Sequence, residues 1–153
     1  MSFTTEVKEE LSHVEPTCSH CDAATLAALI RIEGTIFLNG PGHFRLEIST
    51  DVPQVARFII SALHSMYSLK TDLTMRRSVL HKTPNWLIDV PAQPGLNEAL
   101  SELGIVGESG LQRGIDHDLI KKECCASAYL RGVFSGSGFI SNPRCDFHFE
   151  LTV

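Results

Sequence analysis

Long hydrophobic runs and an excess of positive charge are both missing from this sequence, and each absence limits what the chain can do. No apolar stretch approaches the roughly 18 residues that span a bilayer. The first residues, MSFTTEVKEEL, lack the basic segment and the apolar segment of a secretory signal. We therefore expect a cytoplasmic chain without membrane contact. The net charge of -5 gives no general attraction to nucleic acid, so DNA binding would need a local basic face.

The cysteine count argues against a disulfide framework. Five cysteines are an odd number, and thiols stay reduced in the cytoplasm. The length of 153 residues suits one ordinary domain or two small repeats packed together. With 43% hydrophobic and 20% charged residues, the composition is that of a folded protein.

Hydrophobic periodicity and turn residues divide the chain into alternating helices and hairpins, which predicts an α+β fold. Gly34 directly follows one helix, and we expect it to act as the helix C-cap. The sequence NGPG at 39–42 and the residues around Pro84 are the expected hairpin turns. In chain order, the predicted elements are helices at 3–14 and 19–33, a hairpin at 35–50, a helix at 54–67, a hairpin at 73–90, a short helix at 95–105, a loop at 106–114, a helix candidate at 116–123, a helix at 124–136 and a strand–turn–strand unit at 139–153.

An internal repeat is visible when residues 20–36 are laid over residues 124–140. Cysteine, alanine, leucine, glycine and isoleucine coincide at a constant offset, and HFRLEI at 43–48 then meets HFELTV at 148–153 after one inserted residue. Such fixed offsets indicate a duplication, although two unrelated helices, each followed by a hairpin, are the alternative. The first copy continues through a further helix and hairpin, whereas the second stops at Val153. We therefore expect a fragment of a longer protein, or a partner that supplies the rest.

Two nine-residue segments carry a resemblance to a known family. LAALIRIEG at 26–34 resembles the LAGLIDADG signature of homing endonucleases, and LRGVFSGSG at 130–138 resembles a second, degenerate copy. The resemblance implies that two such helices pack side by side through small residues, here Ala27, Ala28 and Gly132. It also implies saddle-shaped sheets that lie on DNA. The predicted fold is then a duplicated helix–hairpin–helix–hairpin repeat with a truncated second copy, in which an N-terminal helix at 1–17 precedes repeats at 18–115 and 116–153.

A narrower resemblance comes from MSFTTEVKEEL, the cysteine-rich lead into the first motif helix, and CCASAYLRGVF. Together they are similar to the WhiA family of sporulation regulators from Gram-positive bacteria. This implies a DNA-binding regulator of sporulation and cell division, associated with the nucleoid. It would bind DNA mainly through a C-terminal helix-turn-helix domain that is absent here, and a regulatory protein partner is possible. One departure is that the family usually has two adjacent cysteines before each motif helix, whereas the first pair here is His20-Cys21.

The motif acids decide whether cleavage is expected. Metal-assisted phosphodiester cleavage needs hard oxygen ligands near the phosphate, and the endonuclease layout takes one carboxylate from each motif. The eighth motif position is Glu33 in the first copy but Ser137 in the second, and no acid lies between Glu123 and Asp146. We therefore predict no enzyme activity and no catalytic residue, with Glu33 a relic or a solvated acid. The alternatives are an active metal-dependent nuclease and a module that only binds proteins.

Four cysteines offer a metal site as an alternative. The thiols of four cysteines could together coordinate one zinc ion: Cys18, Cys21, Cys124 and Cys125. However, directly adjacent cysteines such as Cys124 and Cys125 are poorly spaced to bind one metal ion. The pair Cys18 and Cys21 lies at a helix start, without the tight turn of a zinc knuckle. The sequence therefore favours buried, reduced cysteines, with no metal and no cofactor.

Basic residues on predicted strands are the candidates for DNA contact. Arg45 is predicted to lie on the solvent-exposed face of its strand. Arg76 and Arg77 are consecutive and point to opposite faces, so only one of these two can contact a ligand. Glu47 and Asp89 on nearby strands would repel phosphate. Ordinary solvated strand residues are the alternative interpretation. The predicted DNA-contact set is Arg45, Arg76, Arg77 and Lys82, with Lys70, His43 and His81 as further basic residues.

Overall fold

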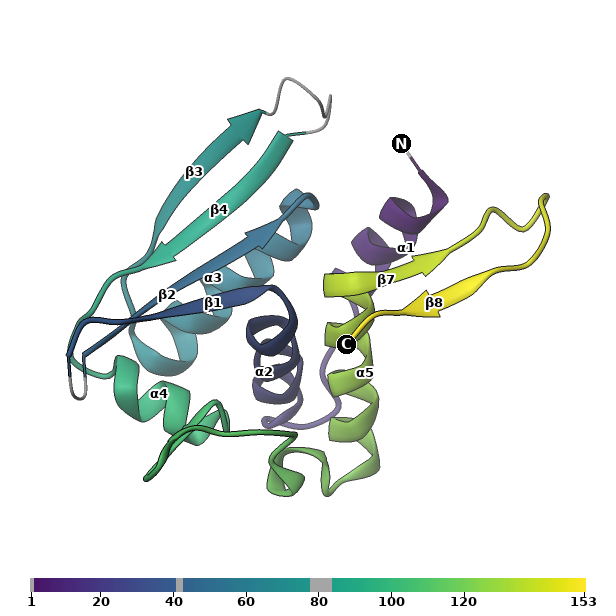
Figure 1. Ribbon diagram of the computed structural model, residues 1–153. Coiled ribbons are helices and arrows are strands. Elements are labelled where there is room, and N and C mark those ends of the chain that lie inside the picture. The colour runs from purple at the N-terminus through teal and green to yellow at the C-terminus, as the bar shows by residue number, and fades with distance from the viewer. Residues whose placement is uncertain (1, 41–42, 78–83) are drawn as a thin grey trace.

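The computed structural model describes residues 2–40, 43–77 and 84–153, and it has the predicted α+β architecture (Figure 1). An N-terminal helix comes first, then three helices and three antiparallel strand pairs of the first repeat among the described residues, and then a second helix–hairpin unit. The elements are α1 (Phe3–Ser12), α2 (Cys21–Glu33), β1 (Gly34–Leu38), β2 (Phe44–Thr50), α3 (Pro53–Tyr67), β3 (Asp72–Arg77), β4 (Pro84–Val90), α4 (Leu96–Glu102), β5 (Val106–Gly107), β6 (Gly110–Leu111), a 3-10 helix (His117–Ile120), α5 (Glu123–Ser137), β7 (Gly138–Ile140) and β8 (Phe149–Leu151).

The first repeat forms one antiparallel sheet with the strand order β1-β2-β4-β3. Along β2, Leu46 and Ile48 are fully buried, while Arg45 and Glu47, which alternate with them, are half-buried on the opposite face. This alternation is the period-2 pattern expected of a sheet with one face on the core. Helices α2 and α3 cover the buried face, so the other face remains open.

Helices α2 and α5 lie side by side and join the two repeats (Figure 1). A Cβ atom added to Gly132 would lie 2.5 Å from the Thr25 carbonyl oxygen and 2.7 Å from Ala28 Cβ. The Thr25 hydroxyl donates to the Ala128 carbonyl oxygen across the pair at 3.0 Å. The helices therefore approach closely enough for a side-chain hydroxyl of one to bond the backbone of the other, and the glycine makes that approach possible.

The two glycines that end the motif helices occupy the C-cap positions, as predicted for Gly34, and both have an extended backbone. Gly34 has φ -88° and ψ 150°, and Gly138 has φ -75° and ψ 151°, so neither adopts the left-handed C-cap conformation. Each helix instead passes directly into a strand. A Cβ atom on Gly34 would lie 2.3 Å from the Ile30 carbonyl oxygen, and one on Gly138 would lie 2.2 Å from the Phe134 ring. Gly34 thus caps α2 as predicted, but crowding by the preceding helical turn, not a positive φ, requires glycine here.

Two further predictions need correction between α4 and α5. The segment predicted as a loop contains a short hairpin, in which Val106 pairs with Leu111. The helix candidate at 116–123 is only a 3-10 turn, His117–Ile120, in which the Asp118 amide donates to the Asp116 carboxylate. Parts of both predicted hairpin turns, at 41–42 and at 83, lie outside the described residues. None of the helices in the described part of the chain combines the length and hydropathy needed to cross a bilayer.

Candidate functional site

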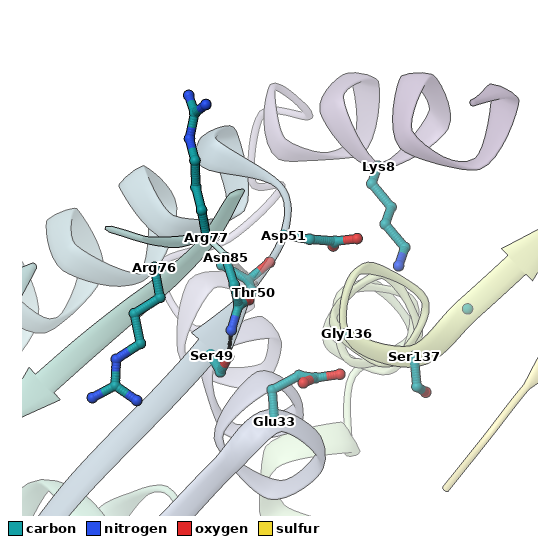
Figure 2. A pocket seen from close by; sticks show the side chains of 11 residues that line it. Lys8, Glu33, Ser49, Thr50, Asp51, Arg76, Arg77, Asn85, Gly136 and Ser137 are labelled. Atoms are coloured by element: carbon teal, nitrogen blue, oxygen red, sulfur yellow. Dashed lines mark hydrogen bonds between the residues drawn. The ribbon is translucent and has the colours of Figure 1, made fainter. Parts of the chain in front are cut away.

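A cleft of about 740 Å³ lies where α2 and α5 end beside the sheet (Figure 2). Four parts of the chain meet there: α1, the C-terminal ends of the two motif helices, the end of β2, and the β3–β4 pair. The resemblance to endonucleases places the metal-binding acids at these helix ends. The lining residues are Lys8, Glu33, Ser49, Thr50, Asp51, Arg76, Arg77, Asn85, Gly136, Ser137 and Gly138.

Glu33 is the acid of the first motif, and it is half-buried at the end of α2. Its side chain lies against α5, because a Cβ atom on Gly136 would be 3.2 Å from Glu33 Cγ. Burial raises the pKa of Glu33; Lys8 lowers it and Asp51 raises it further. The carboxylate is thus partly desolvated and faces the partner helix, unlike a fully solvated acid at a helix end.

Replacing Glu33 with glutamine is expected to stabilise the chain at neutral pH. The folded pKa lies above its ordinary value of 4.5, so the folded chain holds the proton more tightly than the unfolded chain does. The ionised carboxylate therefore lowers the free energy of unfolding above the folded pKa, and this penalty vanishes as the pH falls below the ordinary value. Urea unfolding from about pH 7 down to about pH 4 measures this, with Glu108→Gln in an exposed turn as the control. An advantage of Glu33→Gln that grew on acidification would contradict it.

Ser137 occupies the equivalent position in the second motif, but its hydroxyl is directed elsewhere. The oxygen lies within hydrogen-bonding distance of the carbonyl oxygens of Val133, at 3.3 Å, and of Thr152, and it donates to them. Ser137 lines the cleft together with Glu33, and Figure 2 shows its side chain set apart from the Glu33 carboxylate across the end of α5. The second motif therefore contributes neither a carboxylate nor a free hydroxyl beside Glu33.

Lys8 and Asp51 also line the cleft, and the sequence analysis missed both. Lys8 is only 8% exposed on α1, and its side chain extends toward the end of α5 (Figure 2). Helix α1 is held there by Thr4, whose hydroxyl donates to the Ile140 carbonyl oxygen at 2.8 Å and accepts from the Ile140 amide at 3.1 Å. Asp51 directly precedes Val52, the N-cap of α3, and lines the cleft. The motif points to a second acid only in the second copy, so it gives no sign of Asp51.

The two consecutive arginines of β3 lie on opposite faces of the sheet. Arg76 pairs in register with Asn85, whose amide donates to the Ser49 hydroxyl at 2.6 Å on the open face. Arg77 pairs with Pro84 and points the other way (Figure 2). Both side chains are exposed and line the rim of the cleft, and neither forms an ion pair within the described residues.

Arg45 is less available than the sequence suggested. Its guanidinium forms ion pairs with Glu47 and, at 2.9 Å, with Asp89, and it lies 4.5 Å from the centre of the Phe37 ring. The Asp89 hydrogen bond is the largest of the effects that raise the pKa of Arg45. Two carboxylates thus neutralise this cation on the open face. Lys82 and His81 lie outside the described residues.

The four cysteines singled out in the sequence come together at the opposite end of the helix pair. Their Sγ atoms all lie within 4.8 Å of one another, although adjacent cysteines had counted against such a cluster. We call Cys18, Cys21, Cys124 and Cys125 the cysteine cluster. The fifth cysteine, Cys145, is exposed beyond β7.

Comparison of the sequence with models of known protein families identifies the family of this chain. The model of the WhiA N-terminal LAGLIDADG-like domain matches residues 19–106, more than half of the chain. The chain belongs to the WhiA family. A second model, the WhiA LAGLIDADG-like domain, matches residues 126–153, so the two WhiA segments fall on the two copies of the repeat.

Curated WhiA relatives match almost the whole chain. The cell division protein WhiA of Desulforamulus reducens is 39% identical over 99% of the chain, and that of Heliobacterium modesticaldum is 35% identical over 99%. In both cases the match covers 48% of the relative, so the chain spans about half the length of the curated relatives it matches. The family resemblance drawn from the sequence is thereby confirmed.

A solved structure supports the fold. The crystal structure of the N-terminal LAGLIDADG domain of a WhiA protein superposes with a TM-score of 0.68, covering 98% of this chain and 65% of that one, at 18% identity. This confirms the predicted α+β, LAGLIDADG-like fold. The repeat boundaries at 18–115 and 116–153 stay a prediction.

Proposed function

We propose that this chain is the non-cleaving LAGLIDADG-like part of a WhiA-type transcription regulator of cell division and sporulation, and that it contacts the DNA backbone. The observation that carries the proposal is the asymmetry of the two motif ends. Glu33 lies in the cleft, while Ser137 has no carboxylate and donates its hydroxyl to backbone carbonyls. The pair of motif carboxylates that would hold a divalent ion in the endonuclease layout is therefore incomplete.

The cleft also contains a cation where a nuclease would hold its metal ion. The Lys8 charge offsets part of the rise that burial causes in the pKa of Glu33, and the Lys8 side chain extends toward the same helix end. A fixed ammonium group offsets carboxylate charge but can neither activate water nor polarise a phosphate as a Lewis acid does. This favours DNA contact without cleavage.

Arg76, Arg77 and Lys8 supply positive charge around the cleft for phosphate groups. Such contacts fix the position of a duplex without reading its sequence, so sequence recognition would fall to another domain of the full-length protein. Glu33 and Asp51 reduce the attraction, and the net charge of the chain is -5. We therefore expect weak binding with a clear dependence on salt.

Fluorescence anisotropy of a labelled duplex, titrated with the chain at several salt concentrations, tests the binding. Two to three phosphate contacts predict a slope of about -2 to -3 for the logarithm of affinity against that of salt concentration. Supercoiled plasmid incubated with the chain and Mg²⁺ or Mn²⁺ should stay intact. Nicking that Glu33→Gln abolishes and Glu108→Gln retains would instead establish the nuclease alternative.

Protein contact is the second candidate function, because the β7–β8 hairpin exposes aromatic side chains. Phe147 is 84% exposed, Phe149 51% and Phe139 48%. Large apolar groups gathered on one hairpin are a feature of interaction surfaces. Failure to bind duplex DNA even at low salt would favour this role over backbone contact.

A further inference from the structure

The cysteine cluster lies at the start of both motif helices, far from the cleft. Cys21 is the first residue of α2, and Cys18 lies one turn before it, joined by a hydrogen bond from the Cys21 amide to the Cys18 carbonyl oxygen at 3.3 Å. Cys124 and Cys125 lie in the first turn of α5. Each copy of the repeat therefore contributes two thiols to one point of the interface between the helices.

The sulfur positions match the size of a single tetrahedral metal ion. Zn–S bonds of about 2.3 Å place the sulfurs of a tetrahedron about 3.8 Å apart. The Cys18 sulfur lies 3.5 Å from that of Cys21, 3.5 Å from that of Cys125 and 3.6 Å from that of Cys124. An iron–sulfur cluster surrounds several iron atoms and needs a wider arrangement of ligands than four sulfurs within 4.8 Å.

Adjacent cysteines reach a common point here because they occupy a helix start that faces another chain segment. Cys125 is 3% exposed and turns into the helix pair, while Cys124 is half-buried beside it. The sulfur of Cys18, from the segment before α2, contacts the sulfurs of both Cys124 and Cys125. The spacing within each cysteine pair does not reveal this arrangement, because Cys18 completes the group of sulfurs.

The electrostatic surroundings favour thiolates. Two helix N-termini meet at the cluster, and each carries partial positive charge and amides without intrahelical acceptors. Neither N-cap residue, His20 for α2 or Lys122 for α5, makes a side-chain capping hydrogen bond. The partial positive charge of both helix ends therefore favours thiolates at the cysteine cluster.

We propose that the cysteine cluster binds one zinc ion in a closed tetrathiolate site that joins the first turns of the two motif helices. All four coordination positions are filled by protein sulfur, so the site is structural and leaves no position for a water or a substrate. Zinc binding releases the thiol protons and replaces the three weak contacts of the Cys18 sulfur with the other cluster sulfurs by metal bonds. The ion thus clamps the N-terminal ends of the same two helices whose C-terminal ends form the cleft.

Metal analysis of the 153-residue chain tests the proposal. The chain is purified under reducing conditions without chelator or a metal-affinity step, and zinc is measured by inductively coupled plasma mass spectrometry. We expect about one zinc ion per chain. Titration of zinc-free chain with Co²⁺ should give the visible bands and the sulfur-to-metal charge-transfer absorption of a tetrahedral thiolate site. This readout uses the unaltered chain and does not depend on any variant folding.

Matched cysteine variants locate the site. Cys18→Ser and Cys124→Ser alter partly exposed ligands, and each should lose stoichiometric zinc and the cobalt bands. Cys145→Ser removes the exposed cysteine outside the cluster and should retain both. Circular dichroism checks that each variant is folded, and a chelator should lower the thermal midpoint of the parent and of Cys145→Ser but not of Cys18→Ser.

Three results would overturn the proposal. One is reduced, folded chain that neither contains zinc nor binds Co²⁺. Another is a disulfide between cluster cysteines, detected by mass spectrometry of protein kept under reducing conditions. The third is iron with inorganic sulfide in place of zinc. None of these outcomes bears on DNA binding at the cleft, so the two proposals succeed or fail separately.

Discussion

Replacing Gly132 with valine is expected to lower the free energy of unfolding by about 3 kcal/mol, because overpacking a tight interface costs about 1–3 kcal/mol and occasionally more. Even the first carbon of a side chain would lie 2.5 Å from the Thr25 carbonyl oxygen and 2.7 Å from Ala28 Cβ. Backbone cannot turn aside as a flexible side chain does, so α2 and α5 must separate. Separation would also stretch the hydrogen bond from Thr25 to Ala128.

Gly136→Ala is the matched control, since Gly136 lies on the same helix one turn later. An added Cβ there would be 3.2 Å from Glu33 Cγ and from Ile32 Cγ2, both side-chain atoms that can move. Alanine also gains about 0.5–1 kcal/mol in helix propensity, so this variant should differ little from the parent. Urea unfolding followed by circular dichroism compares the two. Equal stability of Gly132→Val and Gly136→Ala would show that the helices are not closely packed.

The packed helix pair is the part of the fold that the sequence predicts best. Both copies place small residues in a run of apolar ones, and the constant offset between them brings Gly34 onto Gly138. Local pattern and repeat symmetry therefore point to the same interface, and consistency between levels is strong evidence for a structure. The extended backbone of these two glycines was not predicted, since the direct passage from helix to strand leaves no mark in the composition.

The cleft was predicted only in part, because its residues come from distant segments. Glu33 and Ser137 were found through the motif, which fixes their place at the helix ends. Lys8 is brought to the same place by the packing of α1 on α3, α5 and β7, and nothing in the local sequence shows where that helix docks. Arg45 fits the strand pattern, yet its neutralisation by Asp89 depends on the register between β2 and β4. Side-chain partners across a sheet need that register, which hydrophobic alternation alone does not give.

The cysteine cluster illustrates the same limit for metal sites. Chelating spacing is defined along the chain, so Cys124 and Cys125 looked unsuitable as neighbours. The repeat symmetry did connect Cys21 with Cys125, and that was the available signal. What symmetry did not show is that Cys18 reaches both pairs, at 3.5 Å from Cys125 and 3.6 Å from Cys124.

Removing both rim arginines, by Arg76→Ala with Arg77→Ala, is expected to lower DNA affinity at low salt by about a hundredfold. A charge-assisted hydrogen bond to phosphate contributes about 1.5 kcal/mol, which is about tenfold for each arginine. The salt dependence should also become shallower by about two units of slope, since each lost phosphate contact removes about one. If only Arg76 on the open face meets the backbone, the single Arg76→Ala variant accounts for the whole change.

The control pair is Arg113→Ala with Arg144→Ala, which makes the same change in net charge at exposed positions outside the cleft. It separates local phosphate contact from the general effect of a more negative chain. Arg76→Lys keeps the charge but not the planar guanidinium, so it should preserve the salt slope while weakening binding modestly. Anisotropy titrations at matched salt provide all of these comparisons. Equal losses in the two double variants would mean that the cleft does not hold the DNA backbone and that only overall charge matters.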